Sequence, residues 1–91
     1  MFLQIGSTFY NQEWVQSISV YVDTKYDSLY VPMISLTGNN GEVIECFSIE
    51  RFMDEDPDVI EEQADELREK LFQNLGIHNI KIDTVTGEVV C

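Results

Sequence analysis

The sequence predicts an α+β fold in which an antiparallel β-sheet of about four to six strands packs on one amphipathic α-helix. Alternating apolar residues mark the chain before position 50, one segment with helical spacing occupies 57–75, and short apolar runs follow. The predicted order is therefore β-β-β-β-α-β-β. A chain of 91 residues suffices for one domain, and we expect residues 1–91 to form it.

The strand predictions rest on side-chain alternation and on β-branched residues. Residues 14–22 place Ile18, Val20 and Val22 on one face and mainly polar side chains on the other. An earlier apolar run, FLQI at 2–5, predicts a short strand. The remaining predicted strands are 29–36, 42–49, 77–85 and 87–90.

Turns are predicted where Gly, Asn, Asp and Ser gather between the apolar runs. TGNNG at 37–41 predicts a hairpin, because Asn and Gly tolerate positive φ. Residues 23–28 predict a second turn. Pro32 cannot donate a hydrogen bond in a central ladder, so we expect an edge strand or a bulge around it.

The helix prediction combines a start signal, an apolar stripe and a stop signal. Asp56 can cap the first turn, Pro57 suits the first helical position, and Asp58 favours the positive end of the helix dipole. Gly76 is placed to end the helix. The apolar stripe predicted to face the core consists of Ile60, Ala64, Leu67, Leu71 and Leu75.

Negative charge is concentrated in one part of the chain. The net charge is -12, and residues 50–70 hold ten acids and three bases. More than half of the net charge therefore lies in less than a quarter of the sequence. Such a surface repels nucleic acid and anionic membranes and attracts basic proteins, so we expect no direct contact with nucleic acid or membrane.

These acids fall on the side of the predicted helix that is opposite the apolar stripe. At about 100° per residue, Asp58 and Glu69 lie roughly opposite Ile60, whereas Arg68 and Lys70 lie at the borders of the stripe. We call the resulting surface the acidic ridge. Its predicted partner-binding residues are Asp54, Glu55, Asp58, Glu62, Asp65, Glu66 and Glu69.

Two interpretations of the acidic ridge stay open. Its carboxylates follow one another roughly every 3 Å along about 16 Å of helix, close to the ~3.4 Å phosphate spacing of one DNA strand. This match favours a mimic of nucleic-acid charge that occupies a basic groove on another protein. The alternative is a solvated face that only confers solubility. The scarcity of interleaved bases favours the mimic, because unpaired like charges on a helix cost stability.

The strands predict a sheet with two apolar faces. Folding the first hairpin about residues 25/26 places Val20 opposite Val31. Folding the second about residues 39/40 adds the side chains of the next strand to both faces. One helix covers only one face, so the second is predicted to bind a partner or a second copy as a homodimer. A different strand register would exchange the faces. The residues predicted for this second face are Tyr21, Tyr30, Ile34, Phe47 and Ile49.

The segment 7–14 is predicted to be a loop that carries three aromatic residues. Phe9, Tyr10 and Trp14 have two possible roles there. They either anchor a binding partner or close one end of a small core.

No catalytic, metal or cofactor site is expected. Asp54, Asp56 and Asp58 alternate as in a calcium loop, but Val59 stands where that loop needs glycine. Two cysteines and the single His78 give no zinc spacing. The sequence shows no nucleophile with an adjacent base and no glycine-rich phosphate loop, so we expect no enzyme.

The expected location is the cytoplasm. The first residues lack the basic start and long apolar run of a signal peptide, and no apolar stretch is long enough to span a membrane. Cys46 and Cys91 are expected to be reduced thiols, with Cys46 in the core.

In size, charge and lack of catalytic motifs, the chain resembles the small acidic proteins that phages and mobile elements use against host defence and DNA-handling enzymes. The resemblance rests on these general features, and no residue role carries over from it. It implies a non-catalytic inhibitor that docks on a basic nucleic-acid-binding protein. The alternative is an assembly or immunity-type subunit that binds through the apolar sheet face and uses its acids only for solubility.

Overall fold

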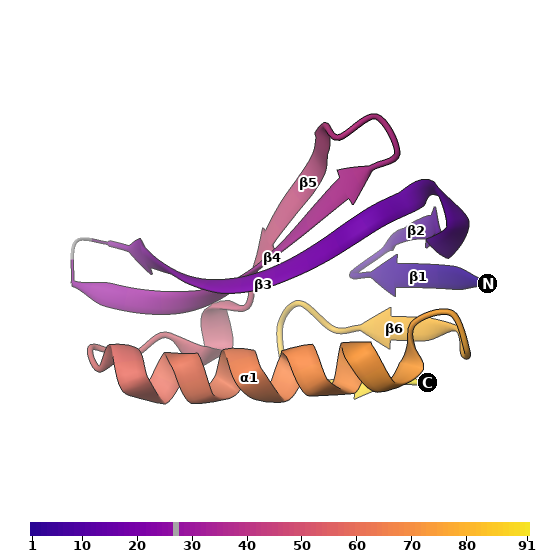
Figure 1. Cartoon of the computed structure of the whole chain (residues 1–91). Coiled ribbons are helices and arrows are strands. Elements are labelled where there is room, and N and C mark those ends of the chain that lie inside the picture. The colour runs from indigo at the N-terminus through magenta and orange to yellow at the C-terminus, as the bar shows by residue number, and fades with distance from the viewer. Residues whose placement is uncertain (27) are drawn as a thin grey trace.

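The computed structural model describes residues 1–26 and 28–91 (Figure 1). Within these residues, seven strands form two sheets that pack on a single α-helix, so the α+β prediction is confirmed. Two short 3-10 helices, η1 (Gln12–Trp14) and η2 (Glu50–Phe52), connect strands to their neighbours. The main elements are β1 (Phe2–Ile5), β2 (Thr8–Asn11), β3 (Val15–Lys25), β4 (Leu29–Gly38), β5 (Val43–Ser48), α1 (Pro57–Asn74), β6 (Ile80–Ile82) and β7 (Val89–Val90).

The two sheets divide the strands by position in the chain. One sheet has the order β3-β4-β5 and is antiparallel throughout, while the other has the order β2-β1-β6-β7. In the second sheet β1 and β6 run parallel, which joins the first strand to the segment after the helix. Figure 1 shows α1 running beneath β3, with β1, β2 and β6 beside the end of α1 that is nearest to both chain termini.

The expected loop at 7–14 is a strand and a short helix instead. Gly6 adopts a φ of 61° and lets β2 turn back on β1, where Ile5 pairs with Thr8. Phe9 and Trp14 are 62% and 70% exposed, so they do not close the end of the core. Only Tyr10 of the three aromatic residues packs against the core cluster.

The helix begins as the sequence predicts. The side chain of Asp56 accepts a hydrogen bond from Asp58 N at 2.9 Å, and Pro57 occupies the first turn. Gly76 follows with a φ of 76°, the left-handed conformation that ends many helices. Leu75 lies just outside the helix and is 37% exposed, so its predicted place in the apolar stripe is wrong. The buried helical residues are Ile60, Ala64, Leu67 and Leu71.

One core cluster joins both sheets to the helix. Strand β1 contributes Leu3 and Ile5, and β6 contributes Ile80 and Ile82 by the same alternation. The three-stranded sheet, the N-cap of η2 at Ile49 and α1 supply the other buried members: Val20, Ile34, Leu36, Ile49, Ala64, Leu67 and Leu71. The two small sheets are therefore parts of one packed body.

The predicted register of the first hairpin is wrong. Val20 pairs with Ile34, whereas a fold about 25/26 would have paired it with Val31. Lys25 pairs with Leu29, and the predicted turn includes residue 27, which lies outside the described residues. The difference is three positions, and an odd shift moves every side chain of one strand to the other face. Ile18, Val20 and Val22 of β3 therefore share the core face with Ile34 and Leu36 of β4.

Pro32 lies in the central strand β4, where the sequence favoured an edge or a bulge. It stands opposite Val22 and accepts a hydrogen bond from Ile49 N through its carbonyl at 3.0 Å. Its nitrogen faces the end of the β5 pairing, since β5 ends at Ser48. The N–H that proline lacks would therefore lie at the end of the β4–β5 hydrogen-bond ladder, and no bond inside the ladder is lost.

The opposite face of the three-stranded sheet carries serines among its residues and leaves Cys46 exposed. Ser35 pairs with Ser19 on one side and with Cys46 on the other, and Cys46 Sγ lies 3.5 Å from Ser35 Oγ. Both Cys46 and Cys91 are free and exposed. The expectation that Cys46 belongs to the core is therefore wrong.

Substitution of Gly87 by alanine should destabilise the fold strongly. Gly87 has a φ of 74°, and an added Cβ would overlap the ring of Phe52 and lie 3.0 Å from Ile49 Cγ2. Gly41 offers a matched control, because its φ is 82° and an added Cβ would meet nothing within 4 Å. We expect a loss of about 1 kcal/mol for Gly41→Ala and roughly 2–4 kcal/mol for Gly87→Ala. Urea unfolding measures both, and equal losses would contradict the packing at Gly87.

Tyr10 links the two sheets through a hydrogen bond. Its hydroxyl on β2 donates to Glu45 Oε2 on β5 at 2.5 Å. Partial burial, followed by the hydrogen bond and the negative charge of Glu45, raises the pKa of Tyr10 to about 12. A raised pKa means that folding favours the neutral phenol. This stabilisation is complete below a pH of about 10 and is lost as the pH rises through the pKa of the folded protein.

Tyr10→Phe should therefore lower the free energy of unfolding by roughly 1 kcal/mol at neutral pH. The difference from the unmodified protein should shrink as the pH rises from about 10 to about 12. Denaturant unfolding at a series of pH values measures this difference. As a control, Glu45→Gln should lower the pKa of Tyr10, read from tyrosinate absorbance. A difference that stays constant across the pH series would contradict the assignment.

Candidate functional site

The acidic ridge is carried by α1 and by the two residues that precede its cap. Asp54 is fixed to the sheet, because its N–H donates to the carbonyl of Tyr30 and its own carbonyl accepts from Tyr30 N at 2.8 Å. The half-buried Asp54 and the exposed Glu55 therefore extend the surface beyond the helix start. The helical members Asp58, Glu62, Asp65, Glu66 and Glu69 are all exposed.

The alternating aspartates at the start of the ridge have a structural explanation. Asp54 Oδ1 accepts from Asp56 N at 2.9 Å, and Asp56 Oδ1 accepts from Asp58 N at 2.9 Å. Each carboxylate thus satisfies a backbone donor two residues later. In the described part of the chain, no group of three or more His, Cys, Asp or Glu residues is placed to hold a metal ion.

Arg68 lies on α1 at the flank of the ridge, and its guanidinium is already engaged. It forms ion pairs with Asp65 and with Glu61, the latter at 3.3 Å. Its Nε donates to the carbonyl of Val20 on β3 at 2.8 Å. Arg68 therefore ties one flank of the helix to the sheet and neutralises Asp65.

The other helical acids of the ridge have no cationic partner among the described residues. Glu62 and Glu66 make no described side-chain hydrogen bond, and Glu69 accepts a long one from Gln73 Nε2 at 3.4 Å. The predicted spacing of Glu66 with Lys70 gives no ion pair in the described residues. Uncompensated carboxylates thus follow the outer side of α1 from Asp58 to Glu69.

This arrangement produces a long, narrow field of negative potential. The helical rise from Asp58 to Glu69 is about 16 Å. A helix fixes the spacing of these charges, so the ridge presents them without an ordering cost when a basic surface approaches. Long-range attraction of this kind speeds association and weakens with added salt.

The predicted apolar binding face does not exist as a surface. Ile34 and Ile49 are fully buried in the core, and Phe47 packs against it. Tyr21 pairs with Met33 on the opposite face, and Tyr30 is half-buried beside Asp54. The cause is the three-residue register difference, which places Ile34 of β4 opposite Val20 of β3, on the face that α1 covers.

Sequence reasoning missed an exposed aromatic side chain beside the ridge. Phe72 on α1 is 84% exposed, and it lies one turn after Arg68 and Glu69. The helical period alone predicts this exposure, because Phe72 lies about 120° from Ile60 around the helix and therefore outside the apolar stripe. An exposed aromatic side chain next to charges is a common feature of protein interfaces.

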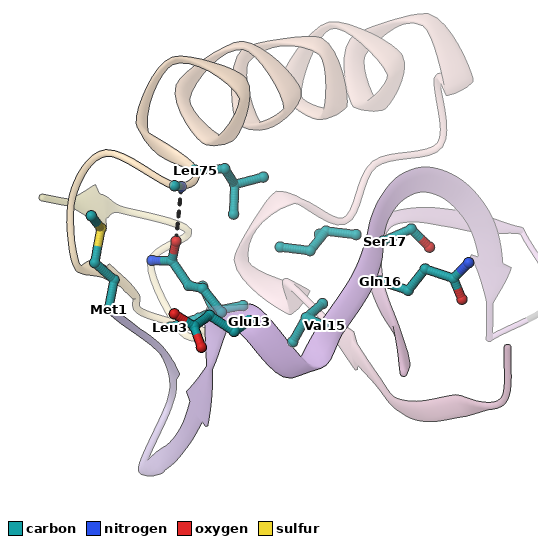
Figure 2. Close-up of a pocket in the computed structure, with 10 residues that line it drawn as sticks. Met1, Leu3, Glu13, Val15, Gln16, Ser17 and Leu75 are labelled. Atoms are coloured by element: carbon teal, nitrogen blue, oxygen red, sulfur yellow. Dashed lines mark hydrogen bonds between the residues drawn. The ribbon is translucent and has the colours of Figure 1, made fainter. Parts of the chain in front are cut away.

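An apolar hollow lies near the C-terminal end of α1. It has a volume of about 460 Å³ and is lined by residues of β1, η1, β3 and the helix end. Figure 2 shows Leu75 and Val15 on opposite sides of this hollow, with Leu3 and Met1 at one end. Gln12 Oε1 accepts from Gly76 N at 2.9 Å and fixes the chain at the helix end.

None of the comparisons places the chain in a known group, since no protein family model, no curated protein and no solved structure matches it. Within the described residues, α1 lacks the apolar length that a helix needs to cross a membrane.

Removing the Arg68 guanidinium should cost stability, whereas removing the Lys70 ammonium should not. Arg68→Met keeps the apolar stem but loses two ion pairs and the hydrogen bond to Val20, for an expected loss of roughly 1–2 kcal/mol. Lys70→Met changes the net charge equally and should stay within about 0.5 kcal/mol of the unmodified protein. Thermal and urea unfolding measure both, and equal losses would show that net charge alone is responsible.

Proposed function

We propose that this protein is a non-catalytic inhibitor whose acidic ridge mimics nucleic-acid charge and blocks a basic nucleic-acid-binding site on another protein. The observation that carries the proposal is the row of exposed carboxylates on the outer side of α1, of which only Asp65 has a described cationic partner. Such a row matches the spacing of phosphates along one strand, about one charge per 3.4 Å.

The rigid geometry of the ridge supports this function over simple solubility. Solubility needs net charge, but it does not need charges held in line on one helix. Here Asp54 is fixed to Tyr30, the helix is capped by Asp56, and Arg68 holds the helix flank to β3. The ridge is thus an ordered array, which a basic groove can bind without first ordering it.

The type of target follows from the charge. A protein that binds DNA or RNA presents Lys and Arg side chains along a groove, and the ridge would pair with the side chains that otherwise contact phosphates. This function places the protein in the cytoplasm with its target, in agreement with the counter-defence role that its size and charge suggest. We do not propose the alternative of an assembly subunit that binds through the predicted apolar sheet face, since Ile34 and Ile49 of that face are interior residues.

Charge reversal on the ridge should weaken target binding strongly. Glu62→Lys combined with Glu66→Lys places two cations in the row and should weaken affinity by at least about tenfold, mainly through slower association. The target is first captured from a bacterial lysate at low salt and should be displaced by added DNA. Binding of the purified target is then measured by surface plasmon resonance at several salt concentrations.

A matched control separates the ridge from the total charge. Glu42→Lys combined with Glu88→Lys changes the net charge equally at two exposed acids outside the ridge, and affinity should stay within about threefold. Circular dichroism verifies that both variants fold. Equal weakening by the two pairs, or capture that DNA does not displace, would refute the mimic.

A further inference from the structure

Strand β3 has one edge that pairs with no other strand among the described residues. It is the end strand of the order β3-β4-β5, and it is 11 residues long. A long, unpaired edge is a template for another strand, and proteins usually block such an edge or use it for binding.

The strand register shows which backbone groups of β3 point outward. Pro32 directs its carbonyl toward β5, where it accepts from Ile49 N, so Val22 opposite Pro32 is not in a hydrogen-bonded pair. Val22 therefore directs its own N–H and C=O away from β4. By alternation, Ile18 and Val20 do the same.

Two side-chain contacts agree with this direction and block part of the edge. Arg68 Nε donates to the carbonyl of Val20 at 2.8 Å, and the Asp23 carboxylate accepts from Thr24 N at 2.8 Å. No other described hydrogen bond reaches the outward groups of Ile18, Val20 or Val22. Apart from the Val20 carbonyl, the outward N–H and C=O groups of Ile18, Val20 and Val22 thus have no described partner.

An apolar groove runs beside this edge on the core face. The hollow of about 460 Å³ is continued by a second of about 240 Å³, and the two share Ile18 and Leu75. The second hollow is bordered by Phe72 of α1 and by Val20 of β3. Figure 2 shows the first hollow opening between β3 and the helix end at Leu75.

We propose that the outer edge of β3 and this groove bind an extended segment of another protein, which adds an antiparallel strand along Ile18–Val22. Residues of the added strand opposite Ile18 and Val20 direct their backbone groups to β3 and their side chains to the groove. These residues are apolar, because Leu75 and Phe72 line the groove. The alternate residues of the added strand face solvent and are Lys or Arg.

Charge complementarity selects a basic partner over a second copy of the chain. Glu13 lines one hollow, and Arg68 lines the other together with its two ion-pair partners Glu61 and Asp65, so each end of the edge keeps one net negative charge. A second copy would bring a further net charge of -12 against these acids. A segment with Lys or Arg at alternate positions is attracted instead.

This docking surface goes beyond the proposed function. It uses backbone pairing and an apolar groove, whereas the acidic ridge acts through charge on the outer side of α1. The two can therefore be tested separately, and either can fail while the other stands.

The probe is a panel of fluorescent ten-residue peptides that alternate Lys with Val, Ile, Leu or Phe. Binding to the full chain is followed by fluorescence anisotropy, and amide hydrogen exchange is followed by NMR. We expect saturable binding and new protection at the amides of Ile18, Val20 and Val22. The amides of Ser19 and Tyr21 already pair with β4, so their exchange should change little.

Backbone N-methylation of the peptide supplies a matched control that leaves the protein unchanged. In an antiparallel added strand, the apolar residues donate to β3 and the lysines donate to solvent. N-methylation of the apolar residues should weaken binding by at least about tenfold, whereas N-methylation of the lysines should weaken it by less than about threefold. Equal effects of the two modifications would overturn the proposal.

Variants of the protein locate the groove and separate it from the ridge. Leu75→Ser should weaken peptide binding by about fivefold, and Val85→Ser at an exposed turn should not. Glu62→Lys with Glu66→Lys should leave the alternating amide protection in place. Absence of saturable binding by every peptide up to about 1 mM would overturn the proposal. So would a dimer of the free chain, detected by sedimentation, that protects the same amides.

Discussion

The register between β3 and β4 is the constraint on which the rest of the structure depends. With Val20 opposite Ile34 and Ile18 opposite Leu36, the two longest strands place these four apolar side chains on one face. That face is then wide enough for α1 to cover, and the other face keeps the serines. A shift by one residue would have left half of these side chains in water on the wrong side of the sheet.

Docking of α1 on this face makes the acidic ridge possible. Ile60, Ala64, Leu67 and Leu71 are buried, and a fully buried leucine or isoleucine contributes roughly 1.5–3 kcal/mol. Repulsion between neighbouring carboxylates on an exposed helix costs a few tenths of a kcal/mol per pair, or about 0.2–0.5. Burial therefore outweighs the repulsion, and the helix tolerates a row of unpaired acids on its outer side.

Arg68 stands where the two proposed surfaces meet. Its ion pairs limit the charge of the ridge at Asp65, and its hydrogen bond to the Val20 carbonyl occupies part of the β3 edge. The ridge would govern the rate of encounter with a basic target, because charge acts at long range. The edge would govern register and specificity, because backbone pairing and apolar fit act only at contact.

The sequence by itself determined the elements whose signals are local. The Asp56 cap, the stop at Gly76, the hairpin at 37–41 and the alternation of β3 all depend on residues within a few positions of one another. The outward position of the acids follows from the helical period alone. The exposed position of Phe72 follows from the same period, although it was not predicted from the sequence.

Only the tertiary structure decided how these elements pair. The register of β3 on β4, the parallel pairing of β1 with β6 and the place of Pro32 depend on contacts between residues far apart in the chain. The burial of Ile34 and Ile49 depends on such contacts too, and for this reason the predicted apolar surface is absent. The physical reason is that alternation assigns side chains to two faces of a strand, but which face is buried depends on the neighbouring strand and on the helix that covers them both.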